Sequence, residues 1–262
     1  MIRALMTAAS GMKVQQMQVD TIANNIANVN TTAFKKNSLA FREMLYETIR
    51  EPGAPTTANS MAPTGLQIGS GAEISSSMKL FRQGEIVPTS NPFDMAITGA
   101  GFFRVLLGSG DFRYTRDGSF RPDGNGQLVT SEGYPLDPPV RIPADAIEVI
   151  IGEDGTISTL KSEGDPPETL TNISVFRFPN PTGLKAVGNN LYVETASSGN
   201  VAQAAPGVDG TGTIRQGFVE RSNVQVVDEL VSLILAQRNY EINSRAIQVS
   251  DEMLQQVNNM VR

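Results

Sequence analysis

The stretch ELVSLILAQRNYEINSRAIQVSDEMLQQV, residues 229–257, places an apolar residue at every seventh position. This row is Leu233, Tyr240, Ile247 and Leu254, and it continues to Val261. The row four positions earlier holds mostly small or amide residues: Glu229, Ala236, Asn243, Ser250 and Val257. Such a sustained repeat is typical of a helix in a coiled coil. A terminal helix packed on its own domain is the alternative, and it fits less well because globular helices seldom run this far.

The limits of this helix are indicated by its flanking residues. Ser222 is followed three residues later by Gln225, which resembles a capping box. We therefore expect a helix from about Asn223 to Arg262, and assign residues 222–262 to a helical terminal domain.

The first 30 residues repeat the pattern on a shorter scale, so residues 1–32 are expected to complete the same discontinuous domain. The residues expected to pack between subunits, with packing inside one chain as the alternative, are Leu5, Met12, Val19, Ile22, Ile26, Leu233, Tyr240, Ile247, Leu254 and Val261.

The run NNIANVNTTAFKKN, residues 24–37, puts amides where a helix should be ending. Asparagine is a poor helix former because its side chain competes for nearby backbone groups. Within a wall of helices, however, amides can bridge chains without burying charge, so we expect register contacts from Asn24, Asn25, Asn28 and Asn243. For Asn28 and Asn30 the alternative is a simple cap at the helix end.

The two ends are expected to be mostly disordered in a lone molecule and to fold upon assembly. Ordering each residue costs on the order of 1 to 2 kcal/mol of backbone entropy, whereas each stripe residue returns only about 1.5 to 3 kcal/mol when buried.

Between the ends, Asp-Gly pairs stand beside short runs of β-forming residues. These runs include residues 112–115, 128–130, 147–151, 173–178, 191–193 and 214–219. Asp-Gly supplies the positive φ angles of tight hairpins. The fold class is therefore α+β, with a central antiparallel β domain at residues 91–221 and a connecting segment at residues 33–90. In that segment, residues 51–71 are rich in Pro, Gly, Ser and Thr, so that a disordered linker is one interpretation of these residues.

Composition excludes several classes of protein. The chain has 262 residues, no Cys and no His, so thiolate nucleophiles, Ser-His-Asp triads and Cys/His zinc sites are ruled out. We expect no cofactor.

A net charge of -6 disfavours binding of nucleic acid. The short basic groups Lys35-Lys36 and Arg113, Arg116, Arg121 are expected to be solvated. The longest apolar run, Leu230 to Ala236, is too short to span a bilayer, so no membrane insertion is expected. The start, MIRALMTAASGMK, is expected to be mature sequence because Lys13 and Gln15 interrupt any leader-like core.

Several stretches of this chain resemble the flagellar rod and hook protein family. SGMKVQQMQVDTIANNIANVNTTAFKKN at residues 10–37 is similar to the family's N-terminal signature, and residues 223–260 are similar to its C-terminal one. QGEIVPTSNPFDMAITGAGFFRV and YTRDGSFRPDGNGQLVTSEGYPL extend the likeness inside. At Ala33 the chain departs from the family, in which Gly often precedes the aromatic residue. The resemblance therefore does not predict the backbone conformation of the turn before Phe34.

The resemblance implies a structural subunit rather than an enzyme, with copies stacked helically into a tube that has paired terminal helices inside and β domains outside. It implies passage through the flagellar type III export apparatus and a place in the rod that crosses the periplasm. The implied partners are other copies of the chain, proximal rod proteins, the hook protein, the P-ring and L-ring, and the rod cap.

Within the family, the chain length and the insert at residues 51–71 favour the distal rod, with a proximal rod or hook subunit as the alternative. The resemblance also implies an extended hairpin at about residues 46–67 that reaches neighbours and stiffens the shaft. Its expected residues are Tyr46, Pro52, Gly53, Pro55, Pro63 and Gly65.

A peptidoglycan hydrolase that uses two carboxylates is the alternative from another class, because such chemistry needs no His. Its candidates are Asp111, Asp117, Asp123 and Glu132. Asp117 and Asp123 stand in Asp-Gly turns, where a structural role suffices. The Asp123 region is also a poor calcium loop, since Leu128 occupies the place of the required Gly.

Overall fold

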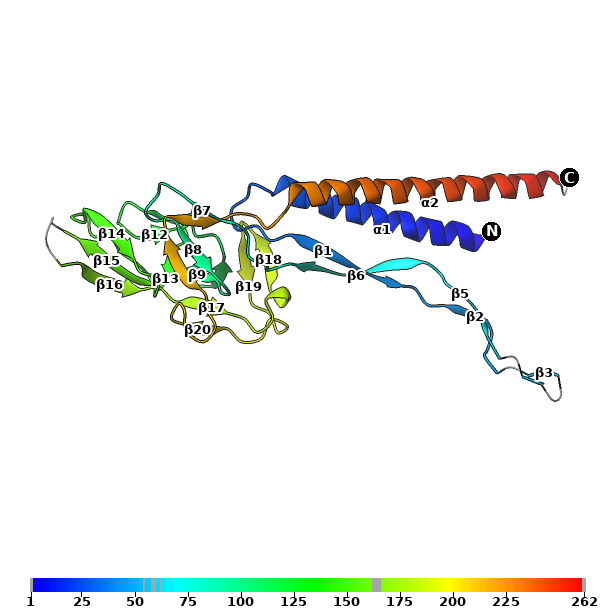
Figure 1. Cartoon of the computed structure of the whole chain (residues 1–262), viewed down its shortest axis with the longest axis horizontal. Coiled ribbons are helices and arrows are strands. Elements are labelled where there is room, and N and C mark those ends of the chain that lie inside the picture. The colour runs from blue at the N-terminus through cyan, green and yellow to red at the C-terminus, as the bar shows by residue number, and fades with distance from the viewer. Residues whose placement is uncertain (1, 54, 58–59, 62, 162–165, 261–262) are drawn as a thin grey trace. The chain divides into compact units, whose positions relative to one another are not determined.

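The computed structural model describes residues 2–53, 55–57, 60–61, 63–161 and 166–260 (Figure 1). The chain divides into two compact units. Unit 1 comprises Met1–Ala27, Asn37–Met78 and Gln225–Arg262, and unit 2 comprises Asn28–Lys36 and Lys79–Val224. The combination of terminal helices with a central antiparallel β region confirms the predicted α+β class. The boundaries of the two units differ from those of the expected regions, because residues 28–36 and 79–90 belong to unit 2.

Unit 1 consists of two helices and a long two-stranded ribbon. Helix α1 spans Ile2–Ala27 and helix α2 spans Val226–Met260. The ribbon pairs β1 (Asn37–Glu43) with β6 (Ala72–Lys79), β2 (Glu47–Arg50) with β5 (Leu66–Ile68), and β3 (Pro55–Thr57) with β4 (Ser60–Met61). The linker prediction for residues 51–71 is therefore wrong where these strands lie, because backbone pairing orders a segment that has little apolar surface.

Helix α2 begins later than predicted. The hydroxyl of Ser222 accepts from the backbone N–H of Val224 at 3.3 Å, and the helix starts at Val226 rather than near Asn223. The expected last residues, Val261 and Arg262, lie outside the described residues. Within the part of the chain that the structure describes, neither helix is apolar enough over a sufficient length to cross a membrane.

Unit 2 is an antiparallel β structure built from small sheets. Five strands form one sheet in the order β13 (Leu136–Asp137), β9 (Phe103–Leu106), β10 (Phe112–Thr115), β19 (Leu191–Val193) and β18 (Lys185–Gly188). A three-stranded sheet joins β14 (Glu148–Ile151), β15 (Thr156–Leu160) and β16 (Glu168–Asn172). Asp154-Gly155 forms the turn between β14 and β15, where Gly155 has a φ of 83°, as Asp-Gly hairpins require.

The remaining strands of unit 2 pair two by two. These pairs are β11 (Arg121–Pro122) with β12 (Leu128–Val129), β17 (Val175–Arg177) with β20 (Ala202–Ala204), β8 (Met95–Thr98) with β21 (Thr213–Gln216), and β7 (Ile86–Pro88) with β22 (Phe218–Glu220). A short 3-10 helix, η1, spans Pro181–Gly183.

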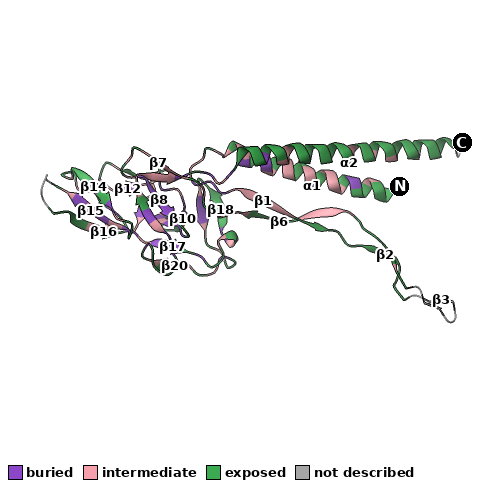
Figure 2. Ribbon diagram, viewed as in Figure 1, coloured by how far each residue is buried: buried purple, intermediate pink, exposed green. Residues whose placement is uncertain are grey.

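The core of unit 2 has an aliphatic part and an aromatic part. The aliphatic part includes Met95, Ile97, Val105, Leu128 and Ile157, all nearly inaccessible. The aromatic part brings together Phe102, Tyr114, Phe176, Phe178 and Tyr192, with edge-to-face contacts such as the 4.8 Å between the rings of Tyr114 and Phe178. Unit 2 thus has a core of its own, whereas Figure 2 shows α2 exposed along most of its length.

Candidate functional site

The two terminal helices run antiparallel inside unit 1, in a register defined by two contacts. Near the end of α1, Asn25 bonds to Glu229 near the start of α2. Fourteen residues away along each helix, a Cβ added to Gly11 would lie 2.8 Å from the side-chain nitrogen of Asn243. The helix backbones therefore approach closely at Gly11, where an added Cβ would require the Asn243 side chain to move. The same register places Ile2 opposite Glu252, so α2 continues past the start of α1 at residues 253–260.

The predicted stripe residues are mostly half-buried within the chain. Ile22 is buried, and the other described members except Tyr240 are half-buried: Leu5, Met12, Val19, Ile26, Leu233, Ile247 and Leu254. Val261 lies outside the described residues. These side chains are thus partly covered inside the chain, and their packing between subunits stays a prediction.

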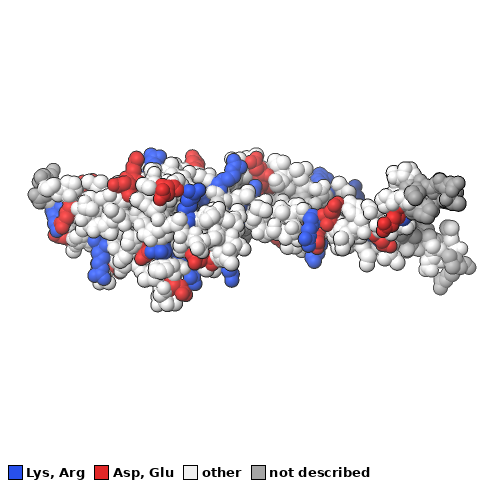
Figure 3. All heavy atoms as spheres, turned by 90° about the horizontal axis from the view of Figure 1, so that it is seen from below, with Lys and Arg blue, Asp and Glu red and all other residues white. Residues whose placement is uncertain are grey.

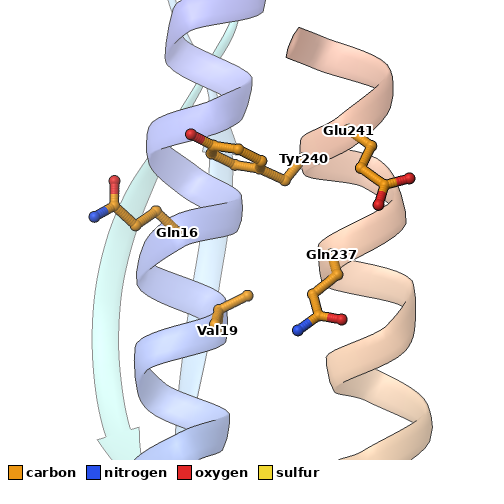
Figure 4. A pocket seen from close by; sticks show the side chains of 5 residues that line it. All are labelled: Gln16, Val19, Gln237, Tyr240 and Glu241. Atoms are coloured by element: carbon orange, nitrogen blue, oxygen red, sulfur yellow. The ribbon is translucent and has the colours of Figure 1, made fainter. Parts of the chain in front are cut away.

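Tyr240 is the exception, since it remains largely exposed beside a hollow between the helices. The hollow has a volume of about 430 Å³ and is lined by Gln16, Val19, Gln237, Tyr240 and Glu241. Figure 4 shows the Tyr240 ring reaching across toward α1, with Val19 and Gln237 facing each other beside it. The hollow is large enough to receive apolar side chains from outside the chain.

A second apolar stripe, which the sequence analysis did not single out, follows another side of α2. Its members are all exposed: Val231, Leu235, Ile242, Val249, Met253 and Met260. They are spaced by four or seven residues, so they lie on one face. Leu235, Ile242 and Val249 stand one position before the row of buried Ala236 and half-buried Asn243 and Ser250, which turns them about 100° around the helix axis. We call these six residues the outer stripe. The signal was present in the sequence as a second seven-residue repeat.

Helix α1 also exposes apolar side chains. Ile2, Met6 and Met17 remain open to solvent in the chain, and they fall on one side of the helix. The exposed side of α1 and the outer stripe of α2 are apolar surfaces without a partner among the described residues.

The amide-rich end of α1 works within the chain. The Asn25 side chain is 1% exposed, accepts from the backbone N–H of Asn37 at 2.9 Å, and donates to the Asn37 carbonyl at 3.0 Å. Its second donor reaches Glu229 at 3.2 Å. The prediction that Asn25 bridges between subunits is therefore wrong, because both of its donors are used inside one chain.

The other amides differ in their surroundings. Asn24 accepts from the Asn37 side chain at 3.3 Å on an exposed surface. Asn28 accepts from the Thr31 hydroxyl at 3.1 Å and, through its carbonyl, from the Thr31 N–H at 3.2 Å. Asn28 thus takes part in the turn that follows the helix.

The ribbon contacts α1 near the point where the β1–β6 pair is followed by the β2–β5 pair. The N–H of Ala72 donates to the Ser10 hydroxyl at 3.4 Å, and Arg3 forms an ion pair with Glu47. A hollow of about 440 Å³ lies beside this contact and is lined by Ser10, Lys13, Val14, Met17, Met44, Ala72, Glu73 and Ile74. Further out, no layer covers the β2 and β5 strands, whose side chains are all exposed.

The expected hairpin residues occupy this ribbon. The Tyr46 hydroxyl donates to Glu43 at 2.8 Å. Pro52 and Gly53 lie in a turn, and Gly53 has a φ of 82°. Gly65 lies so close to the strand opposite that an added Cβ would be 2.8 Å from the Arg50 carbonyl oxygen. Pro55 begins β3, and Pro63 lies in a bend.

The carboxylates of the hydrolase alternative do not line a substrate site. Asp117 and Glu132 border a hollow of only about 10 Å³, which is room for one water and not for a sugar ring. Asp117 accepts from the N–H and hydroxyl of Ser119 at 3.0 and 2.6 Å, and burial raises its pKa. Asp123 accepts backbone N–H groups of Asn125 and Gln127, which lower its pKa. Both aspartates hold turns, and Asp111 is exposed near Ser109.

On the face drawn in Figure 3, positive and negative side chains are interspersed. Among the described residues, no three acidic side chains gather closely enough to hold a metal ion.

Comparison with known proteins gives matches along the whole chain. Residues 5–35 match the flagella basal body rod protein family, residues 96–159 the flagellar hook protein FlgE/F/G D1 domain, and residues 215–260 the flagellar basal body rod FlgEFG protein C-terminal family. The flagellar basal-body rod protein FlgG of Borreliella burgdorferi is 47% identical, with 100% of each chain covered. The chain belongs to the flagellar basal-body rod protein family. Similar proteins of the same name in Buchnera aphidicola and Caulobacter vibrioides are both 43% identical, covering 99% and 97% of this rod-family chain and 100% and 97% of their own.

The matched segments coincide with the parts of this rod-family chain described above. One covers most of α1 and the amide-rich turn, one covers β8 to β15, and one covers β21, β22 and α2. Apart from Ile2, the residues of the unpartnered apolar faces therefore lie within segments that match the family.

Proposed function

We propose that this chain is a structural subunit of the distal rod of the flagellar basal body, and that copies polymerise helically into a stiff hollow shaft that transmits torque and lets exported subunits pass. The observation that carries this proposal is the outer stripe of α2. Monomeric proteins rarely leave so continuous an apolar face open to water, and such faces mark interaction sites.

The occupant of the outer stripe is a second copy of the chain. A contact between two different faces of identical subunits does not close on itself unless the rotation happens to complete a ring, so it generates a helical filament. The exposed side of α1, with Ile2, Met6 and Met17, supplies a second apolar face for such a contact. In this arrangement α1 and α2 form coiled-coil walls, and Tyr240 with its hollow receives side chains of the neighbour.

The predicted regions take corresponding roles. Residues 1–32 and 222–262 line the tube, residues 33–90 connect and carry the stiffening hairpin at about 46–67, and residues 91–221 form the outer β part. The terminal helices complete their folding on assembly. The stripe residues that face the partner helix hold each pair together, while Asn24, Asn28 and Asn243 set register.

The remaining partners follow from the position of a distal rod. They are the proximal rod proteins, the hook protein, the P-ring and L-ring, the rod cap and the type III export apparatus, with the shaft crossing the periplasm. Full-length relatives named as basal-body rod proteins support the rod over a hook subunit. The 10 Å³ hollow at Asp117 disfavours the hydrolase alternative.

Electron microscopy of the full chain at increasing concentration tests the proposal. We expect straight tubular filaments above a threshold concentration. A chain that stays monomeric at millimolar concentration would contradict polymerisation, and curved flexible filaments would favour a hook-type subunit. NMR of the dilute monomer tests folding upon assembly, since full helicity of both ends there would contradict it.

A further inference from the structure

A cluster of buried polar side chains in unit 2 lies outside the proposed assembly surface. The chain passes between the two units four times, so three segments of unit 2 lead directly to or from unit 1. These are residues 28–36 after α1, the segment that begins at residue 79 after the ribbon, and the segment that ends at residue 224 before α2. The polar cluster connects all three.

Glu220 is the centre of this cluster. Its carboxylate accepts from Lys35 Nζ at 2.5 Å and from the Gly84 N–H at 2.8 Å on one oxygen, and from Arg116 Nε at 2.9 Å on the other. Lys35 also donates to the Arg82 carbonyl at 3.0 Å. The expectation that Lys35 and Arg116 are solvated is wrong, because both are buried by these contacts. Burial lowers the pKa of Lys35, while the Glu220 carboxylate opposes that change.

Asn223 makes a second connection between the same three segments. Its side-chain oxygen accepts from the Lys36 N–H at 2.8 Å, and its nitrogen donates to the carbonyls of Leu80 and Arg82 at 2.7 and 3.0 Å. Every donor of this amide is therefore used to join the segments that adjoin α1, the ribbon and α2.

The backbone continues the connection. The Ala33 N–H donates to the Glu220 carbonyl at 2.7 Å, and the Asn223 N–H donates to the Phe34 carbonyl at 3.4 Å. The segment after α1 and the segment before α2 are thus in direct contact within unit 2. Inside unit 1, the helices that continue from these segments run antiparallel, with Asn25 bonded to Glu229.

We propose that Glu220 and Asn223 are positioning residues that hold the segment leaving α1 against the segment leading into α2, and thereby preset the register in which the two helices pair.

The physical reason is the cost of closing a long loop. Helices α1 and α2 are separated by residues 28–225, and bringing the ends of such a loop together costs conformational entropy that grows with its length. Once unit 2 is folded, the two polar connections replace this long loop with short tethers. Short tethers raise the effective concentration of one helix at the other.

The absence of Cys makes the proposal testable by thiol exchange in the full chain. A Cβ on Gly11 would lie 3.2 Å from Cγ of Asn243, so Gly11→Cys with Asn243→Cys places two thiols at disulfide distance. Equilibration with glutathione measures their effective concentration in a dilute monomer, so the result does not depend on polymerisation. We expect Asn223→Ala to lower this effective concentration at least about tenfold, because three hydrogen bonds are lost.

Asn91→Ala is the matched control. Asn91 also uses its amide fully, donating to Asp94 and Phe120 and accepting from the Phe93 N–H, but none of these bonds reaches residues 28–36 or 220–224. This control is expected to change the effective concentration less than twofold. Asn223→Asp keeps the acceptor for the Lys36 N–H, so its effective concentration is expected to fall between those of Asn223→Ala and the parent chain. Glu220→Gln is unsuitable as the main variant because it leaves two buried cations unpaired. Equal effects of Asn223→Ala and Asn91→Ala, or no effect of either, would overturn the proposal.

Discussion

Replacing Ile242 with Gln tests the outer stripe where its consequence can be worked from the structure. Ile242 lies in the middle of the stripe and is 63% exposed in the chain. Burying a whole Ile side chain stabilises by about 1.5 to 3 kcal/mol, so covering the open part contributes roughly 1 to 2 kcal/mol per contact. Each 1.4 kcal/mol is tenfold in an equilibrium constant. The critical concentration for polymerisation should therefore rise about five- to thirtyfold.

Sedimentation of polymer at a series of total subunit concentrations measures this change. Ile147→Gln is the control, because Ile147 is 73% exposed but lies in unit 2. It should leave the critical concentration unchanged. The stability of monomeric Ile242→Gln should change by less than about 0.5 kcal/mol, as is usual for exposed positions. Equal critical concentrations for Ile242→Gln and the parent chain would refute the reasoning.

Four further changes have defined outcomes. Ile247→Asn should loosen the pairing of α1 with α2 and abolish polymerisation, because Ile247 is half-buried within the chain. Near-ultraviolet circular dichroism should still show unit 2 folded, and intact polymerisation would contradict this. Deleting residues 46–67 should give rods that bend in electron micrographs, and unchanged straight rods would remove the stiffening role. Ala33→Val should lower the free energy of unfolding by at least about 2 kcal/mol in urea titrations, since Ala33 is buried at a φ of 56°, whereas Ala33→Gly should change it by less than about 1 kcal/mol. Asp117→Asn should gain stability relative to the parent as pH rises from the ordinary aspartate pKa near 3.8, because a carboxyl whose pKa is raised by folding loses stability over that window; a constant difference between pH 3 and 7 would contradict it.

Local patterns in the sequence predicted much of the fold. The runs at residues 112–115 and 191–193 correspond to β10 and β19, and the Asp154-Gly155 turn joins two strands as expected. These elements were predictable because turn chemistry and β-forming residues act over a few positions. The row Leu233, Tyr240, Ile247 and Leu254 of α2 was also predictable, since an apolar residue at every seventh position indicates one face of a helix.

What sequence patterns could not predict depends on contacts far apart in the chain. Lys35 reads as a surface cation until Glu220, 185 residues away, is brought against it. The sequence pattern predicts that Asn25 contacts a neighbouring subunit, and only the structure shows its bonds to Asn37 and Glu229 within the chain. The ribbon was expected from the family resemblance and not from local patterns, because its strands are held by backbone pairing and carry little of the apolar alternation that identifies buried strands. The outer stripe is a second seven-residue repeat on α2, and the repeat alone does not tell which of the two rows the partner helix covers.

A cryo-EM map of the polymer formed by the full chain tests the central claim most directly. We predict density in which Leu235, Ile242 and Val249 of each copy are covered by a helix of a neighbouring copy, with α1 and α2 of each subunit still paired through Gly11 and Asn243. A map in which these three side chains face solvent on every copy would contradict the claim that the terminal helices build the shaft.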